Sequence, residues 1–182
     1  TAASRMGALM LGFAPGKNGL DLAGIVEASA KGALDALYLL GADEFPVEKL
    51  GRNTFVVYQG HHGDKGASRA DVILPGAAYT EKDAIFVNAE GRVQMTKQAV
   101  FPPGEAKEDW KIIRALSAKL GKTLPYDTLV QVRKWLAAVN PAFGKTDEVA
   151  AAAWQKFGQD GACLKEPFVL PITNFYMTDP IT

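Results

Sequence analysis

The residues best suited to metal or acid–base chemistry are two adjacent histidines, His61 and His62, which lie between Gly60 and Gly63 after an apolar run. They are the only histidines of the chain. A zinc site needs three or four convergent ligands, and neighbouring side chains rarely point at one ion. We therefore interpret Gly60–Asp64 as a tight turn at a strand end, where a histidine hydrogen-bonds locally. A metal site is the alternative.

Cys163 is the only cysteine of the chain. An intrachain disulfide needs two cysteines, and an iron–sulfur cluster is usually held by four thiolates. The sequence also places no base or cation beside Cys163 that would activate its thiol. We therefore expect neither a disulfide nor an iron–sulfur cluster within this chain.

Two Gly-Lys-Thr triplets, which begin at Gly121 and Gly144, resemble the end of a phosphate-binding loop. Such a loop also requires a glycine five residues earlier, and Leu116 and Val139 occupy those positions. We interpret both triplets as helix ends. A free-standing nucleotide-binding protein is therefore disfavoured.

Two pairs of carboxylates are close in the sequence, Glu81 with Asp83 and Glu108 with Asp109. Acid–base catalysis needs groups that are positioned for different roles, and the spacing marks neither pair in this way. We expect these four side chains to lie on solvated surface. The sequence thus predicts no catalytic, cofactor-binding or metal-ligating residue.

The balance of charge argues against nucleic acid as a partner, since 20 basic residues are matched by 20 acidic ones among 182. Proteins that bind the phosphate backbone normally carry an excess of Lys and Arg. The apolar runs are far shorter than the roughly 20 residues that span a bilayer, so we expect no direct membrane insertion. Apolar residues make up 48% of the chain, which is enough for one domain with its own core.

Three uninterrupted apolar runs predict the strands of a sheet: Ala36–Leu40, Thr54–Tyr58 and Val72–Leu74. Runs without alternation are typical of strands that are covered on both faces. The intervals hold short helix-compatible pieces at Val47–Leu50 and Lys65–Ala70. Strand, short crossover and strand is the pattern of an α/β fold, so we expect a parallel-sheet layer that is flanked by helices.

Helical spacing of apolar residues predicts further elements outside the sheet. Asp21 and Asp127 are candidate N-caps, and Trp110 and Trp135 should face the core. The expected helices are 3–11, Asp21 to Val26, Glu105–Leu120, Leu129–Val139 and the alanine-rich Asp147–Phe157. Two extended pieces, Ile85–Val87 and Arg92–Thr96, should surround a glycine turn.

Beyond Gly158 the chain has the composition of an extended tail. It contains three prolines and scattered aromatic residues, among them Phe168, Phe175 and Tyr176. We therefore divide the chain into an α/β domain segment at 1–160 and a tail at 161–182. The aromatic side chains of the tail should lie against another surface.

Two motifs around the third predicted strand are distinctive. Ala70–Lys82 contains Ala-Asp-Val-Ile-Leu-Pro at a strand end, and Val87–Gln94 contains Asn-Ala-Glu-Gly-Arg. Both resemble the molybdopterin oxidoreductase superfamily, and within it the large iron–sulfur subunits of respiratory complex I. The likeness covers nearly the whole chain, least at Asp147 to Pro167, and it also rests on Tyr58–Asp64, Asp109–Leu116, Leu124–Asp127 and Asn174–Asp179.

This resemblance implies a segment of the NADH:quinone oxidoreductase, which transfers electrons from NADH to quinone and pumps protons. It also implies that [2Fe–2S] and [4Fe–4S] clusters belong to the N-terminal part of the subunit, and FMN to another part of the complex. The expected partners are that N-terminal part and other subunits of the peripheral arm. The expected location is the matrix side of the mitochondrial inner membrane, with the cytoplasmic face of a bacterial plasma membrane as the alternative.

We expect the segment to be structural; the alternative is part of an active molybdopterin-dependent oxidoreductase, although the complex I branch generally lacks that cofactor. Redox-active relatives commonly have glycine where this chain has Asp83 and Ala84, which weakens the alternative. Among the matched residues, we expect Asp71 and Arg92 to be tied into hydrogen bonds or an ion pair, and Asn88 into a turn.

Overall fold

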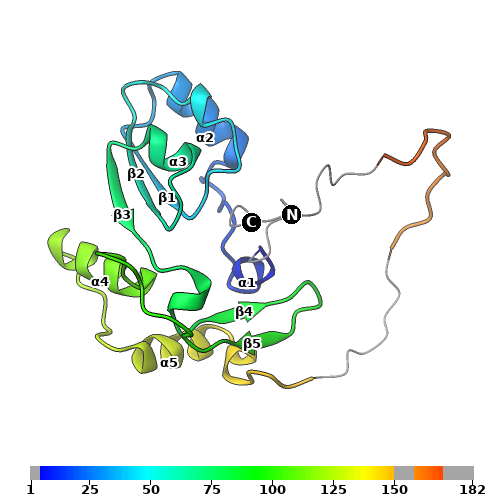
Figure 1. Ribbon diagram of the computed structural model, residues 1–182. Helices are drawn as coiled ribbons and strands as arrows, with labels where there is room; N and C mark the ends of the chain where they lie inside the picture. Colours follow the sequence, from blue (N-terminus) through cyan, green and yellow to red (C-terminus); the bar gives the residue numbers. More distant parts are fainter. Residues whose placement is uncertain (1–4, 150–157, 170–182) are drawn as a thin grey trace.

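The computed structural model describes residues 5–149 and 158–169, and residues 5–149 form two lobes (Figure 1). The first, which we call the sheet lobe, contains a three-stranded sheet and the helices beside it. The second, the hairpin lobe, contains a two-stranded sheet and the remaining helices. The elements in chain order are α1 (Arg5–Met10), α2 (Leu22–Ala30), β1 (Ala36–Leu40), η1 (Val47–Lys49), β2 (Phe55–Gly60), α3 (Lys65–Arg69), β3 (Val72–Pro75), η2 (Tyr79–Glu81), β4 (Ile85–Val87), β5 (Val93–Met95), α4 (Asp109–Lys119), α5 (Leu129–Val139) and η3 (Pro141–Gly144).

The three strands of the sheet lobe are parallel and lie in the order β1-β2-β3. The predicted α/β fold with a parallel sheet is therefore confirmed. β2 extends two residues beyond the predicted strand, because Gln59 pairs with Leu40 of β1 and with Leu74 of β3. The short helices predicted between the strands are also present, as η1 and α3.

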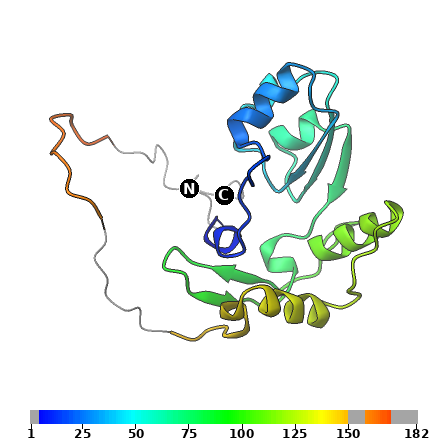
Figure 2. The same cartoon turned by 180° about the vertical axis from the view of Figure 1, so that it is seen from behind.

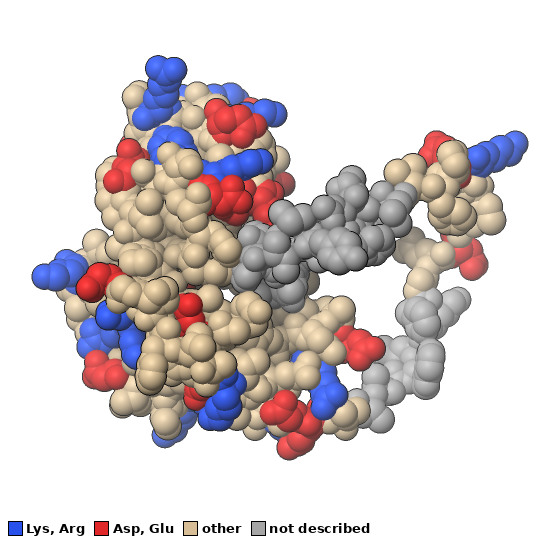
Figure 3. All heavy atoms as spheres, viewed as in Figure 1, with Lys and Arg blue, Asp and Glu red and all other residues tan. Residues whose placement is uncertain are grey.

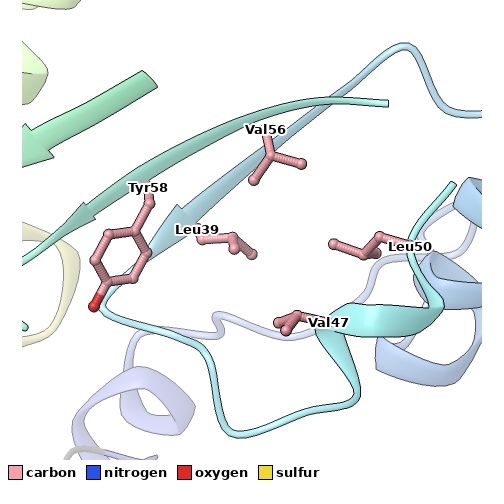
Figure 4. Packing of buried hydrophobic residues seen from close by; sticks show 5 residues of the cluster. All are labelled: Leu39, Val47, Leu50, Val56 and Tyr58. Carbon is pink, nitrogen blue, oxygen red and sulfur yellow. The ribbon is translucent and has the colours of Figure 1, made fainter. Parts of the chain in front are cut away.

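The core of the sheet lobe lies between the strands and the layer formed by α2, η1 and α3. Leu39, Val56 and Tyr58 point from β1 and β2 toward Val47 and Leu50 (Figure 4), and none of the five is more than 7% exposed. Burial of one such side chain contributes about 1.5–3 kcal/mol. This cluster therefore holds the helical layer on one face of the sheet.

Buried polar groups beneath this layer satisfy one another, as buried groups must. The hydroxyls of Ser29 and Thr54 lie 2.8 Å apart, the Gly51 N–H donates to Ser29 Oγ at 2.9 Å, and Thr54 Oγ1 donates to the Leu34 carbonyl at 3.0 Å. A Cβ on Gly51 would lie 2.1 Å from the Ser29 carbonyl oxygen. Only glycine fits at this contact between α2 and the loop before β2.

The hairpin lobe is built on β4 and β5, the two predicted extended pieces, which pair antiparallel. Asn88 Oδ1 accepts hydrogen bonds from the N–H groups of Glu90 and Arg92, and Gly91 has a φ of +84°. The predicted turn at Asn88 is thus confirmed. Val87 and Val93 pack with Phe143 of η3, and α1 covers this cluster.

Asp71 and Arg92 were each predicted to take part in hydrogen bonds or an ion pair, and this is confirmed for the side chain of Asp71 only. Asp71 Oδ2 accepts a 2.7 Å hydrogen bond from the Val56 N–H and lies 3.6 Å from the Arg69 guanidinium. Arg92 is exposed, and its guanidinium makes no hydrogen bond or salt bridge with any residue in 5–149 or 158–169. Its backbone closes the turn, but its side chain does not take the predicted role.

The helix predicted from Glu105 begins later, at Asp109. The reason is that Lys107 forms a parallel bridge with Gly76: its N–H donates to the Pro75 carbonyl and its carbonyl accepts from the Ala77 N–H. A backbone committed to this bridge cannot also close a helical turn. The residues before α4 therefore extend the edge of the sheet next to β3.

The N-cap of α5 is Thr128 and not the predicted Asp127. Thr128 Oγ1 accepts from the Gln131 N–H at 3.2 Å, and the Gln131 side chain accepts from the Thr128 N–H in return. Asp127 instead pairs with Arg114 of α4 at 2.8 Å. The prediction missed by one residue because both types are good caps.

The two tryptophans are less buried than predicted. Trp110 is partly buried, but Trp135 is 47% exposed, so its prediction as a core residue was wrong. The apolar stripe of α5 meets the hairpin lobe along Leu136, which packs against the Val87–Phe143 cluster, and Trp135 lies beside that contact. Tyr126 lies between the two tryptophans, with ring centroids 6.4 and 5.7 Å away.

Gly121 follows α4 with a φ of +73° and Gly144 is the last residue of η3, so both Gly-Lys-Thr triplets are helix ends as predicted. Of the predicted helix at Asp147–Phe157, residues 150–157 lie outside the described residues. Residues 147–149 are not helical, because Asp147 has a φ of +64° and donates its N–H to the Val93 carbonyl.

The first part of the proposed tail, residues 161–169, contains no helix or strand. Leu164, Phe168 and Val169 are at least 80% exposed. Phe175 and Tyr176 lie outside the described residues, and the division at residue 160 stays a prediction. Among the helices that the structure describes, none is long and apolar enough to cross a bilayer.

Candidate functional site: a polar network and an open sheet face

A chain of polar side chains joins the two lobes at the carboxyl ends of the strands. We call Tyr38, Gln59, Lys82 and Asp109 the polar network. The Tyr38 hydroxyl donates to Gln59 Oε1, Gln59 Nε2 donates to Asp109 Oδ1 at 2.8 Å, and Lys82 Nζ lies 2.5 Å from Asp109 Oδ2. Gln59 is completely buried. It therefore connects β1 and β2 to the first residue of α4.

Each member of the polar network has at least one hydrogen-bond or ion-pair partner within it. Burial, and next the negative charge of Asp109, raise the pKa of Tyr38 above its ordinary value, so its hydroxyl remains a donor. Gly76 lets the carboxylate approach, since a Cβ there would lie 3.1 Å from Asp109 Oδ1. The arrangement fastens α4 to the sheet and contains no activated nucleophile.

Sequence reasoning missed this network. Tyr38 was predicted only as a strand residue, Gln59 lay just beyond the predicted strand, and Asp109 was expected on solvated surface. The available signal was a glutamine at the end of an uncharged run, where a buried polar group must find a partner. That partner stands 50 residues away in the sequence, and no local pattern identifies it.

The carboxylates predicted to lie on solvated surface are partly exposed, and each also accepts a hydrogen bond. Besides Asp109, Glu81 accepts from the Ala78 N–H at 2.9 Å, Glu108 accepts from Trp110 Nε1 at 2.7 Å, and Asp83 accepts from the Gln98 N–H at 2.8 Å. The Gln98 bond, followed by the Lys97 ammonium, lowers the pKa of Asp83. These contacts order turns and helix starts.

His61 and His62 follow β2 at the same end of the sheet, with ring centroids 4.6 Å apart. Partial burial lowers the pKa of His61, and the nearby His62 and Lys82 lower it further. None of the described residues hydrogen-bonds either imidazole, and His62 Nε2 is buried without a partner among them. The predicted local hydrogen bond is therefore not observed. The described ranges contain no group of three or more His, Cys, Asp or Glu side chains that could hold a metal ion.

One face of the parallel sheet is covered at Gln59, which Asp109 of α4 reaches, but is uncovered elsewhere, which contradicts the prediction that the strands are buried on both faces. We call the side chains of Tyr38, Leu40, Phe55 and Val72 the open sheet face; they are 37%, 49%, 48% and 40% exposed. The register places all four on the side opposite Leu39 and Val56. Figures 1 and 2 show α2 and α3 on one side of the sheet, whereas on the other side α4 reaches only the ends of the strands, where Asp109 bonds to Gln59.

The surface over this part of the molecule is poor in charge. Figure 3 shows Lys, Arg, Asp and Glu gathered on the top of the sheet lobe and around the hairpin lobe. Between them lies an area without charged atoms, in the region where β3 descends in Figure 1. Large exposed apolar patches often mark interaction sites, and the open sheet face contributes four exposed apolar or aromatic side chains.

The hairpin lobe contains an apolar hollow of about 230 Å³ between α1, β4 and α5. Its lining comprises Gly7, Ala8, Leu11, Ile85, Phe86, Val87, Leu136 and Phe143. None of these side chains carries a charge or a hydrogen-bonding group. The hollow therefore offers no polar side chain that would orient a ligand.

Two family models match the chain. The model described as "Molybdopterin oxidoreductase" matches residues 1–119, and the model for the C-terminal part of the G subunit of NADH-ubiquinone oxidoreductase matches residues 138–182. The resemblance stated from the sequence motifs is thus confirmed.

Similar proteins include "NADH-ubiquinone oxidoreductase 78 kDa subunit, mitochondrial" of Candida albicans, at 47% identity over 99% of this chain and 25% of the relative. The protein of the same description from Neurospora crassa is 43% identical over 100% of this chain and 24% of its own length. The G subunit of the NADH-quinone oxidoreductase of Rickettsia felis is 47% identical over 82% of this chain and 22% of its own. The chain thus spans about a quarter of the length of these relatives.

Among solved structures, acetylene hydratase from Pelobacter acetylenicus superposes with a TM-score of 0.53 and 20% sequence identity. The match covers 65% of this chain and 18% of that one, and it supports the fold alone. Because the oxidoreductase model covers nearly two thirds of the sequence and the fold agrees, the chain belongs to the molybdopterin oxidoreductase family.

Proposed function

We propose that this chain is a structural and interaction segment of a complex I-like NADH:quinone oxidoreductase and performs no chemistry itself. The observation that carries the proposal is the open sheet face, in a chain that resembles complex I subunits along nearly its whole length. Its partners would be the remaining part of the same subunit and neighbouring subunits of the peripheral arm.

The exposed apolar area gives this role an energetic basis. Full burial of a side chain such as Leu or Phe contributes about 1.5–3 kcal/mol, and the four side chains of the open sheet face are roughly half exposed. Covering the rest of each would add about 1 kcal/mol. A partner that covers all four therefore gains about 4 kcal/mol from this surface, enough to direct assembly.

The described residues do not fit the molybdopterin group that the family name mentions. The hollow of the hairpin lobe is lined by apolar side chains, whereas a pterin needs hydrogen-bonding partners. At the carboxyl ends of the strands, where α/β sheets usually bind ligands, the side chains of the polar network bond to one another, and only the imidazoles of His61 and His62 are without a partner among the described residues. This supports a docking role over the rival interpretation as part of an active molybdopterin-dependent oxidoreductase.

The iron–sulfur clusters and the FMN expected from the resemblance would lie outside this chain. One cysteine cannot supply the usual four thiolates. Two of the similar proteins are described as mitochondrial and another is bacterial. The proposed location is the matrix side of the inner membrane, or the cytoplasmic side in a bacterium.

Substitution on the open sheet face tests the docking role. Phe55→Ser and Leu40→Ser, singly and together, should lower the amount of NADH-oxidising assembly seen on native gels. Val130→Ser is the matched control, because Val130 is 75% exposed on α5, and it should assemble normally. Full assembly of the double variant would refute the proposal.

Metal analysis of the assembly distinguishes the proposed structural role from the alternative of a molybdopterin-dependent oxidoreductase. Purified assembly that contains the chain should carry iron and no stoichiometric molybdenum. One molybdenum per copy of the chain would instead favour the molybdopterin-dependent enzyme.

A further inference from the structure

We propose that His61 and His62 form a proton-binding site that controls how firmly α4 is held on the sheet. At neutral pH the polar network holds Asp109, the first residue of α4, on Gln59. A proton on His61 places a second cation beside Lys82 and weakens this attachment. The inference goes beyond the structural role proposed above, because it makes the joint between the sheet and α4 respond to acidity.

The position of His61 brings its side chain toward the polar network. Successive side chains of a strand point to opposite faces of the sheet, so His61, one residue beyond β2, continues the series that contains Gln59. The residue between them stays tied to the sheet, because the Gly60 carbonyl accepts from the Gly76 N–H at 2.8 Å. His61 therefore follows the strand on the side where Gln59 meets Asp109.

Charged groups from three places in the fold act on His61. The ring of His62 lies beside it, with centroids 4.6 Å apart. The other groups are Glu81 of η2, Lys82 directly after η2, and Asp109 of α4. Lys82 and a protonated His62 are positive, whereas the two carboxylates are negative. His61 is therefore within the electrostatic range of both members of the Lys82–Asp109 ion pair.

The imidazoles of His61 and His62 make no hydrogen bond to any described residue, and His62 Nε2 is buried without a partner among them. Buried polar groups without a partner are rare in folded proteins and call for an explanation. Imidazole is also the side chain whose ordinary charge change falls between pH 5 and 8. Uptake of a proton at this pair thus breaks no hydrogen bond that the described residues make.

The surroundings of His61 set the pH range of the response. Partial burial lowers its pKa most, the charges of His62 and Lys82 lower it further, and Asp109 and Glu81 act in the opposite direction. The imidazole is therefore neutral at neutral pH and takes up its proton below the ordinary value of 6.5. The attachment of α4 should be complete above that value and weaken below it.

Protonation changes the balance of charge around Asp109. Lys82 Nζ lies 2.5 Å from Asp109 Oδ2, and Gln59 Nε2 donates to Oδ1 at 2.8 Å. An imidazolium repels the Lys82 ammonium and attracts the same carboxylate, so it competes with both partners of Asp109. Loss of a hydrogen bond to a charged group corresponds to a roughly tenfold to hundredfold increase in local opening. The start of α4 would be released from the sheet to that extent.

Hydrogen exchange tests the proposal on the tagged polypeptide, purified in the assembly that it forms. Exchange of the amides of α4 is compared between about pH 7 and pH 5 with exchange of the amides of α5, which corrects for the general effect of pH. α5 is a suitable reference because it contacts the Val87–Phe143 cluster through Leu136. On acidification α4 should exchange at least about tenfold faster relative to α5. An unchanged ratio would overturn the proposal.

Two variants assign the response to one histidine. His61→Gln keeps a hydrogen-bonding side chain at a partly exposed position but binds no proton, so the ratio should be the same at both pH values. His62→Gln should keep the response and move its midpoint to higher pH, because it removes one charge that opposes protonation of His61. A response that survives in His61→Gln, or is lost in His62→Gln, would refute the assignment.

Discussion

Replacing Gln59 with leucine removes the central member of the polar network with little change of volume. Gln59 is completely buried, accepts from the Tyr38 hydroxyl and donates to the Asp109 carboxylate at 2.8 Å. A neutral hydrogen bond contributes about 1 kcal/mol and one to a charged group about 2 kcal/mol. The apolar side chain recovers about 1 kcal/mol by its own burial. We expect the free energy of unfolding to fall by about 2 kcal/mol.

Urea unfolding of the purified chain, followed by far-ultraviolet circular dichroism, measures this loss. Gln94→Leu is the matched control, because Gln94 lies in β5 and its side chain makes no hydrogen bond with the described residues. It should change stability by less than about 0.5 kcal/mol. Tyr38→Phe should destabilise the wild type by about 1 kcal/mol but have almost no effect in the Gln59→Leu background, because the bond is already lost. A Gln59→Leu chain that unfolds at the wild-type urea concentration would refute the role of the network.

Three other changes follow from the described contacts. Gly51→Ala should lower the free energy of unfolding by about 3 kcal/mol, because the new Cβ would lie 2.1 Å from the Ser29 carbonyl oxygen. Gly63→Ala, where the new Cβ would have no atom within 4 Å, should be nearly neutral in the same urea titration. Thr128→Ala should cost about 1 kcal/mol through loss of the α5 cap, seen as a lower midpoint in thermal unfolding. The pKa of His61 is lowered in the folded chain, so the unfolded chain binds the proton first as pH falls. The stability that this difference contributes is present above the ordinary histidine pKa of 6.5 and is lost as pH falls below it. His61→Gln should therefore flatten the dependence of stability on pH between about 7 and 5, and an unchanged slope would contradict the assignment.

Much of the fold could be predicted from the sequence because its signals are local. The uncharged runs that became β1, β2 and β3, the glycine turn at Gly91 and the cap at Asp21 each depend on a few neighbouring residues. Asp21 accepts from the Gly24 N–H at 2.8 Å, as an N-cap does. The family motifs from Ala70 onward were informative for the same reason.

The remaining features depend on contacts between distant residues. The start of α4 is set by the bridge between Lys107 and Gly76, and the burial of Gln59 by a carboxylate 50 residues away. Uncharged strands also predicted two covered faces, yet Phe55 is 48% exposed in this chain. The uncharged strands predict a sheet that is covered on both faces, whereas the described residues leave most of one face exposed. The docking proposal accounts for this difference through a partner that covers the exposed face.

Affinity purification through a tag on the polypeptide that contains this chain tests the central claim most directly. We predict that the tag retrieves a large assembly that oxidises NADH and reduces quinone, with this chain present in stoichiometric amount. Retrieval of the tagged polypeptide alone, with no other polypeptide and no NADH-oxidising activity, would contradict the claim.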